Sequence, residues 1–172
     1  MTNTKNSPSH RILKKGTCQQ IAPSSKGQLT YEVGASQDNQ QLYIRVTSNS
    51  GGGYFSNEWI ALDAIQQTIE EQAPEQPFKS LVFKPLYVSR GANNCGFLSA
   101  ALRKEGILAV VPKAPYSHLA GDIQAFRAAM QNASKAKGKP MQNASKAKSA
   151  KAKAKAAPKR PARKKAASVF SD

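Results

Sequence analysis

The sequence Leu29-Thr-Tyr-Glu-Val-Gly-Ala-Ser-Gln-Asp-Asn-Gln-Gln-Leu-Tyr-Ile-Arg-Val46 contains two runs in which apolar and polar side chains alternate. Large apolar or aromatic side chains occupy every second position of 29–33 and again of 42–46. This two-residue period is typical of half-buried β-strands. The Ser-Gln-Asp-Asn segment between the runs has the composition of a turn. The sequence therefore predicts an antiparallel hairpin.

Six further elements are predicted after this hairpin. They are a strand, a helix, a strand, a helix, a short strand and a last helix, over about 54–61, 63–73, 78–88, 94–105, 107–111 and 118–131. Asp63 and Gln66 have the spacing of a capping box, which favours a helix start at 63. The helix that begins near Asn94 should end at Gly106, after two basic residues that suit a helix carboxyl terminus.

The predicted order is β-β-β-α-β-α-β-α, which places the chain in the α+β class with a mixed or antiparallel sheet. We expect one small domain over 28–130. Residues 1–27 are rich in Ser, Thr, Asn and Lys and are predicted to form a flexible basic and polar arm. Residues 131–172 are predicted to be a disordered tail, because too little apolar surface is present there to offset the entropy lost on ordering.

Positive charge is concentrated in this tail. Residues 128–172 contain 13 of the 26 Lys and Arg residues but only one acidic residue, so they carry +12 of the formal +16. The remaining 127 residues contain 13 basic and 9 acidic side chains. The sequence Met130-Gln-Asn-Ala-Ser-Lys-Ala-Lys137 recurs eleven residues later as Met141-Gln-Asn-Ala-Ser-Lys-Ala-Lys148, which indicates a local duplication that lengthened the tail.

Nucleic acid is the partner that such a tail favours. Each phosphate neutralised by Lys or Arg releases condensed counterions, and the resulting affinity is insensitive to base sequence. Other polyanions, protein partners and a passive solubilising tail are the alternatives. The tail residues predicted to contact DNA or RNA are Lys135, Lys137, Lys139, Lys146, Lys148, Lys151, Lys153, Lys155, Lys159, Arg160, Arg163, Lys164 and Lys165.

Within the tail, the run from Lys146 to Lys165 combines alternating Ala and Lys with a Pro-Lys-Arg-Pro spacing that starts at Pro158. In these features it resembles the carboxy-terminal tails of linker histones and of bacterial histone-like proteins. The resemblance is one of composition and covers the tail alone. It implies a role in nucleic-acid compaction and carries no implication for residues 1–130.

One face of the predicted hairpin is a candidate base-stacking surface. Tyr43 and Arg45 share the strand face opposite Leu42 and Ile44, and an aromatic ring beside a cation suits stacking on nucleic-acid bases. Tyr31 and Tyr54 would extend that surface if the strand register allows it. The alternatives are an ordinary solvated sheet face and a face covered by a helix.

The loop Ser89-Arg-Gly-Ala-Asn-Asn-Cys-Gly96 is a second candidate site, because it precedes the predicted helix that begins near Asn94. Backbone amides at a helix amino terminus, together with Arg90, could hold a phosphate or carboxylate. The loop lacks the lysine that follows the glycines of a phosphate-binding P-loop. A structural loop without a ligand is the alternative.

Cys95 is the candidate nucleophile, because a thiol near a helix start can have a lowered pKa. A catalytic thiol needs a base within hydrogen-bond reach, and the two histidines are His10 in the predicted arm and His118 at a predicted turn. A buried, unreactive cysteine is the simpler reading. Two cysteines and two scattered histidines make no zinc-binding spacing, and no cofactor motif is apparent.

The sequence favours a non-enzymatic nucleic-acid-binding protein whose tail contacts phosphates and whose domain provides shape or assembly, as a monomer or a homodimer. The alternatives are a protein-interaction module with a tethering tail and a hydrolase that uses Cys95. Cys18 and Cys95 could pair, but Cys18 lies in the predicted arm, so a reducing compartment is the simpler reading. No membrane span or secretory signal is apparent. We therefore expect a cytoplasmic or nucleoid protein in bacteria, or a nuclear one in eukaryotes.

Overall fold

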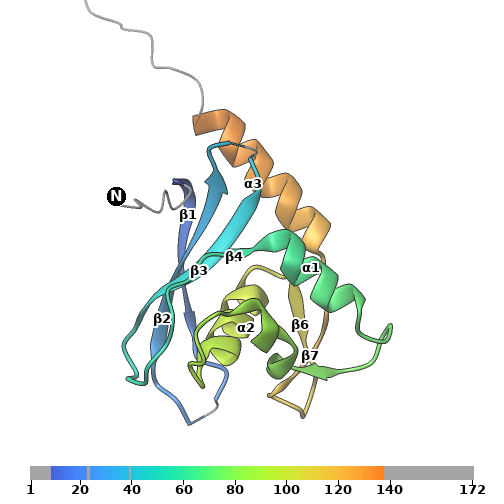
Figure 1. The fold of residues 1–172 in the computed structure, drawn as a ribbon. Coiled ribbons are helices and arrows are strands. Elements are labelled where there is room, and N and C mark those ends of the chain that lie inside the picture. The colour runs from blue at the N-terminus through green and yellow to red at the C-terminus, as the bar shows by residue number, and fades with distance from the viewer. Residues whose placement is uncertain (1–8, 23, 39, 138–172) are drawn as a thin grey trace, which may run out of the picture. The chain divides into compact units, whose positions relative to one another are not determined.

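The computed structural model describes residues 9–22, 24–38 and 40–137. It contains a four-stranded sheet in the order β1-β2-β3-β4 and a three-stranded sheet in the order β5-β7-β6, both antiparallel (Figure 1). The α+β class is confirmed. The strands are β1 (His10–Gln19), β2 (Gln28–Ser36), β3 (Leu42–Asn49), β4 (Ile60–Ala61), β5 (Phe78–Lys79), β6 (Leu108–Val110) and β7 (Ser117–Ala120). The helices are α1 (Leu62–Glu70), the 3₁₀ helix η1 (Ser80–Leu86), α2 (Asn94–Lys104) and α3 (Ile123–Lys137).

The predicted hairpin is confirmed as β2 and β3. The two strands pair antiparallel, and the register runs from Leu29 opposite Asn49 to Ala35 opposite Leu42. The alternating apolar side chains of both strands are buried on one sheet face, which packs against α2. The spacing that predicted the strands is therefore the spacing that builds the core.

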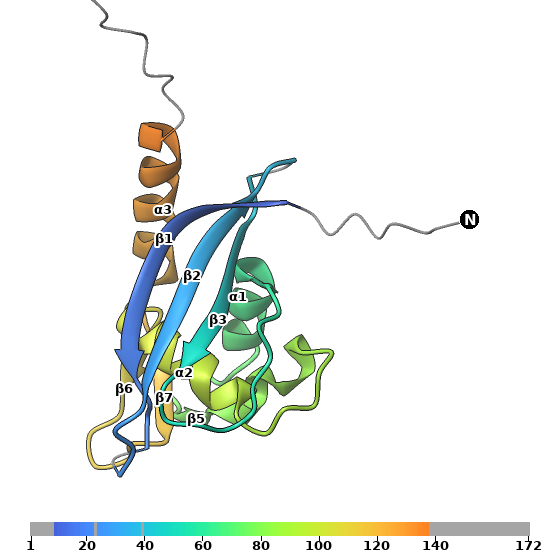
Figure 2. The same cartoon turned by 90° about the vertical axis from the view of Figure 1, so that its left-hand side faces the viewer.

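Residues 10–19 form β1, so the flexible arm predicted over 1–27 is wrong for this segment. β1 pairs antiparallel with β2 along its whole length (Figure 2), with one irregularity between Ile12 and Lys14. Gly16 is required where it stands, because an added Cβ would lie 2.4 Å from atoms of the Tyr31 side chain. Lys15 lies on this edge strand, where charge and an irregular register oppose pairing with another chain.

The elements predicted between 54 and 73 are shorter than expected. Only Ile60–Ala61 form a strand, and α1 begins at Leu62 without a side-chain cap. The predicted capping box is wrong, because the Asp63 carboxylate accepts hydrogen bonds from Arg127 and from Gln41 instead. This pairing joins α1 to α3 across the chain.

The strand predicted over 78–88 is also wrong. Two residues pair as β5, and Ser80–Leu86 then form the 3₁₀ helix η1, which contains Pro85. The helical turn buries Phe83 completely and leaves Leu81 67% exposed. A continuous apolar run has no two-residue period, so it does not distinguish a buried strand from a short helix.

The helix predicted from Asn94 is confirmed as α2. It ends before Gly106, whose φ of 76° is a conformation that glycine adopts readily. The predicted strand over 107–111 is confirmed as β6. Strand β7 was not predicted, and α3 therefore begins at Ile123 rather than at 118.

Helix α3 continues to Lys137, beyond the domain boundary predicted at 131. Phe126 and Met130 on this helix are buried in the main core, which joins the four-stranded sheet to α1, α2 and η1. The described residues lie in one compact unit. The disorder predicted over 131–172 is wrong for 131–137, which are helical because α3 packs its apolar side on the core, and the remaining 138–172 lie outside the described residues.

Candidate nucleic-acid interface

Tyr43 and Arg45 occupy the face of β3 opposite its buried side chains, as predicted. Both are partly buried by neighbouring side chains. The Arg45 guanidinium donates to one oxygen of Glu32 from Nη2 at 2.7 Å and from Nε at 3.1 Å. It also lies 4.3 Å from the centre of the Trp59 ring, which is a cation–π distance. Arg45 is thus already engaged with a carboxylate and an aromatic ring.

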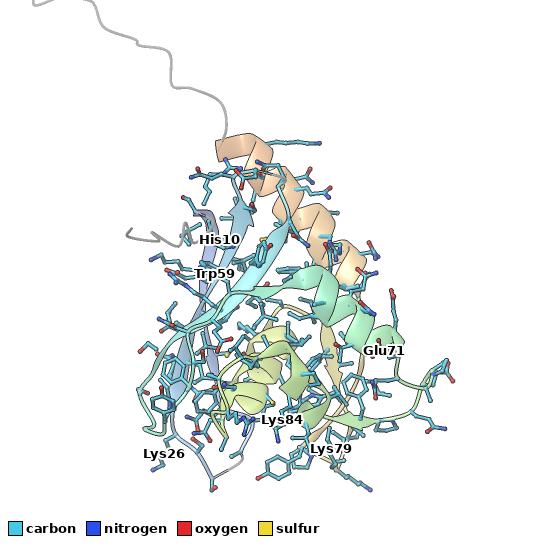
Figure 3. All side chains as sticks on the ribbon, in the orientation of Figure 1. His10, Lys26, Trp59, Glu71, Lys79 and Lys84 are labelled. Carbon is cyan, nitrogen blue, oxygen red and sulfur yellow. The ribbon has the colours of Figure 1, made fainter. Side chains whose placement is uncertain are left out.

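The aromatic rings on this face contact one another. His10, which lies beside Trp59 in Figure 3, stacks on that ring at 4.6 Å between ring centres. It also meets the Tyr43 ring edge-on at 4.5 Å. Gly34 lies beneath Trp59, since a Cβ there would be 3.0 Å from the indole. Sequence reasoning missed Trp59 and His10, because the first lies before a short strand and the second lies in the segment predicted to be an arm. A base could stack here only by displacing these contacts.

The other two tyrosines do not extend this face. Tyr31 lies on the core side of β2, is 1% exposed and donates from its hydroxyl to the Glu105 carboxylate. Burial and this hydrogen bond raise the pKa of Tyr31. Tyr54 is 80% exposed in the loop before β4, and its carbonyl accepts from Asn93. The stacking surface predicted from the four positions is therefore not assembled as one platform.

Acidic residues neutralise several cations around the four-stranded sheet. Glu32 lies between Arg45 and Lys15, whose ammonium is 2.7 Å from its carboxylate. Burial raises the pKa of Glu32, but the hydrogen bonds from these two cations outweigh it and hold the pKa below its usual value. Lys14 pairs with Glu105 at 2.6 Å in the same way. Cations with such partners are poorly placed to bind phosphates.

Arg90 lies beside a hollow of about 340 Å³ at the connection between η1 and α2. The loop is held in shape by Asn94, which is 2% exposed and binds the backbone amide of Ser56 and both oxygens of Ser89. The Glu58 carboxylate accepts from the backbone amides of Val88 and Ser89 at 2.8 and 3.0 Å. The predicted loop site is therefore a rigid concave surface with Arg90 at its edge.

Lys84 lies beside the same hollow, and sequence reasoning did not single it out. Among residues 9–22, 24–38 and 40–137, no carboxylate lies within ion-pair distance of Lys84 or Arg90. Both side chains are exposed. These two cations are available to an anionic ligand, unlike Arg45, Lys15 and Lys14.

Cys95 lines this hollow and is 9% exposed. Burial raises the pKa of its thiol, against the smaller opposing effects of its own backbone N–H and of the Lys84 ammonium. A raised pKa favours the protonated thiol, which is the poorer nucleophile. The local environment is thus the opposite of the one that activates a cysteine.

His118 is completely buried, and both of its ring nitrogens are engaged. Arg103 Nε donates to Nδ1 at 2.9 Å, which places the ring proton on Nε2, 2.8 Å from Ser80 Oγ. Burial and the nearby Arg103 and Lys79 cations lower the pKa of His118 to about 4. This imidazole has no ring nitrogen free to act as a base for Cys95.

In the part of the chain that the structure describes, no cluster of three or more His, Cys, Asp or Glu side chains could hold a metal ion. The helices of that same part are too short or too polar to cross a bilayer.

Two of the predicted tail contacts lie on α3. Lys135 is exposed on α3, and Lys137 is the last residue of that helix. The others lie outside the described residues, namely Lys139, Lys146, Lys148, Lys151, Lys153, Lys155, Lys159, Arg160, Arg163, Lys164 and Lys165.

The comparisons with known proteins give no relative: no family model matches the chain, and it has no detectable match among curated proteins or solved structures.

Proposed function

We propose that this protein binds DNA or RNA with little sequence preference, and that its carboxyl-terminal cations supply most of the affinity. The observation that carries the proposal is the charge distribution. Residues 128–172 contain 13 basic side chains and a single acid. That single acid can neutralise at most one of the thirteen cations within this segment, so a polyanion is the natural counter-charge.

Lysine supports binding to phosphates rather than reading of bases. Its ammonium reaches the backbone of either groove and carries no directional pattern for base edges. Log affinity should then fall with log salt at a slope of about −0.9 for each duplex phosphate contact. The domain would contribute shape, assembly or strand preference rather than the bulk of the affinity.

The test replaces charge without removing residues. In one variant the ten Lys and Arg residues from Lys146 to Lys165 are changed to Gln, which leaves α3 intact. In the matched control the eight lysines among them are changed to Arg, which preserves the charge. Gel shifts with duplex and single-stranded probes of one sequence are then measured across salt concentrations.

We expect the Gln variant to lose most of its affinity and to approach a flat salt dependence, because counterion release requires the cations. The Arg control should bind like the parent chain. If the Gln variant bound within about twofold of the parent at all salt concentrations, an effect below about 0.5 kcal/mol, the proposed role of these cations would be wrong.

A further inference from the structure

Two adjoining hollows lie at the connection between η1 and α2. The first has a volume of about 340 Å³ and extends toward Cys95 and Ala92. The second has a volume of about 560 Å³ and extends over Pro85 and Val88. They share a wall formed by Leu81, Lys84, Tyr87, Ser89 and Arg90. A ligand that spans both hollows must pass over this wall.

Apolar side chains are unusually exposed around the wall. Leu81 is 67% exposed and Val88 is 92% exposed, and both border the second hollow. Tyr87 lines both hollows, and burial raises the pKa of its hydroxyl. Such a surface, flanked by polar groups, is typical of a binding site.

The charged side chains among the residues that line the two hollows are Lys84 and Arg90. Lys84 lies in η1 and Arg90 lies in the loop before α2, and both line the first hollow together with Cys95. Neither Lys84 nor Arg90 has a carboxylate partner in the described part of the chain. The Glu58 carboxylate is nearby, but its oxygens are satisfied by two backbone amides and by the Ser56 hydroxyl.

We propose that the two hollows bind two successive unpaired nucleotides of a single-stranded nucleic acid, with the phosphate between them on Lys84 and Arg90. The proposal rests on the function proposed above and assigns strand preference to the domain. The wall shared by the hollows carries both cations beside Leu81 and Tyr87, so it offers charge to a phosphate and apolar and aromatic surface to the bases on either side of that phosphate. A duplex keeps its bases stacked inside and cannot offer their faces to Tyr87 or Leu81.

The test uses a dithymidine dinucleotide that carries one phosphate, titrated into the full-length chain by NMR. A single phosphate gains little from the carboxyl-terminal cations, because their affinity depends on many simultaneous contacts. We expect the amide signals of Tyr87, Ser89 and Cys95 to shift. We also expect alkylation of Cys95 to slow in a Cys18→Ser background, because a bound nucleotide would cover the thiol.

The Lys84→Gln, Arg90→Gln double variant should lose at least about tenfold in dinucleotide affinity, since it removes two charge-assisted phosphate contacts. The matched control is Lys26→Gln, Lys113→Gln, which removes the same charge at positions outside both hollows. Equal losses in the two variants, or a dinucleotide that shifts none of the three amide signals, would overturn the proposal.

The two proposals fail independently. The Gln variant of Lys146 to Lys165 should still bind the dinucleotide with unchanged affinity, whatever happens to its binding of long probes. An acidic peptide with apolar side chains is the competing occupant. If such a peptide shifted the Tyr87 and Cys95 signals and the dinucleotide did not, this surface would be a peptide-binding site.

Discussion

Residues 9–77 and residues 78–121 of the domain carry opposite net charge. The first region contains five basic and seven acidic side chains, whereas the second contains six basic and one acidic side chain. The near balance of acidic and basic residues in the domain as a whole is therefore the sum of two regions with opposite net charge. In the first, Glu32 binds both Lys15 and Arg45. In the second, the single acid, Glu105, pairs with a lysine of the first.

The difference shows what the cations of each region can do. Arg45 is fixed by Glu32 and Trp59, so it supports the structure of the sheet. In the second region Arg103 is satisfied by neutral acceptors, among them two backbone carbonyls. Lys84 and Arg90 have no acid partner among the described residues. Binding of anions by the domain is therefore expected in the second region.

The largest expected effect concerns His118. Its pKa is about 4 in the folded protein, because burial and the cations Arg103 and Lys79 disfavour the charged ring, and is about 6.5 in the unfolded chain. The unfolded state therefore binds a proton first, and stability falls as the pH drops from about 6.5 to about 4. The expected loss is about 3 kcal/mol in the free energy of unfolding.

Chemical denaturation at pH 7, 5.5 and 4.5 measures this loss. Most of the stability that carboxylates with lowered pKa values contribute is still present over this range, because it is lost only as the pH falls further toward their folded pKa values. A His118→Gln variant is the control, because it removes the titrating ring and keeps His10. Its stability should depend less on pH over this window than that of the parent. Equal pH dependence in the two proteins would mean that the second region does not keep His118 neutral.

A Glu32→Gln substitution should make the first region resemble the second. It leaves Lys15 and Arg45 without their carboxylate, and Arg45 is 29% exposed at its side chain. Because both cations remain partly exposed to solvent, we expect a loss of about 1–2 kcal/mol in the free energy of unfolding rather than the full effect of a buried pair. Denaturant titration at pH 7 gives this difference.

Asp38→Asn is the matched control for charge, because Asp38 is exposed and forms no ion pair among the described residues. The pKa of Glu32 is lowered in the folded state, so its contribution should be present above about pH 4.5 and disappear as the pH falls through its folded pKa. A Glu32→Gln protein as stable as the control would show that the pairing is without structural effect.

The parts of the fold that the sequence predicted well are those with a clear period. Residues 29–33 and 42–46 alternate strictly, and α2 has both an apolar face and Gly106 as a stop. β1 was missed because Leu13 is the one large apolar side chain that this strand buries fully, and the partly buried positions that follow are Lys14, Gly16 and Cys18. Its pairing with β2 depends on Tyr31 lying over Gly16, a contact between distant residues that no local pattern reveals.

The candidate site was only partly predictable for the same reason. Arg90 was identified from a loop before a helix, but Lys84 lies in η1, which the apolar run from 78 to 88 presented as a strand. Tyr43 and Arg45 were placed on the correct face of β3, yet nothing in the sequence pairs them with His10, from the predicted arm, or with Trp59, from the strand predicted over 54–61. Whether a cation is available to bind a ligand depends on its neighbours in space, and the sequence alone does not give these neighbours.

The smallest expected effect is the change in stability when Lys84 and Arg90 are both replaced by Gln. Exposed residues without partners usually change the free energy of unfolding by less than about 0.5 kcal/mol, and relief of repulsion among six cations favours a slight gain. Lys14→Gln is the contrast, because it leaves the Glu105 carboxylate, which is 5% exposed, without its ammonium. The free energies of unfolding of the parent, the double variant and Lys14→Gln distinguish cations that stabilise the fold from cations that are available to a ligand. If the double variant were as destabilised as Lys14→Gln, Lys84 and Arg90 would be cations that stabilise the fold, like Arg45.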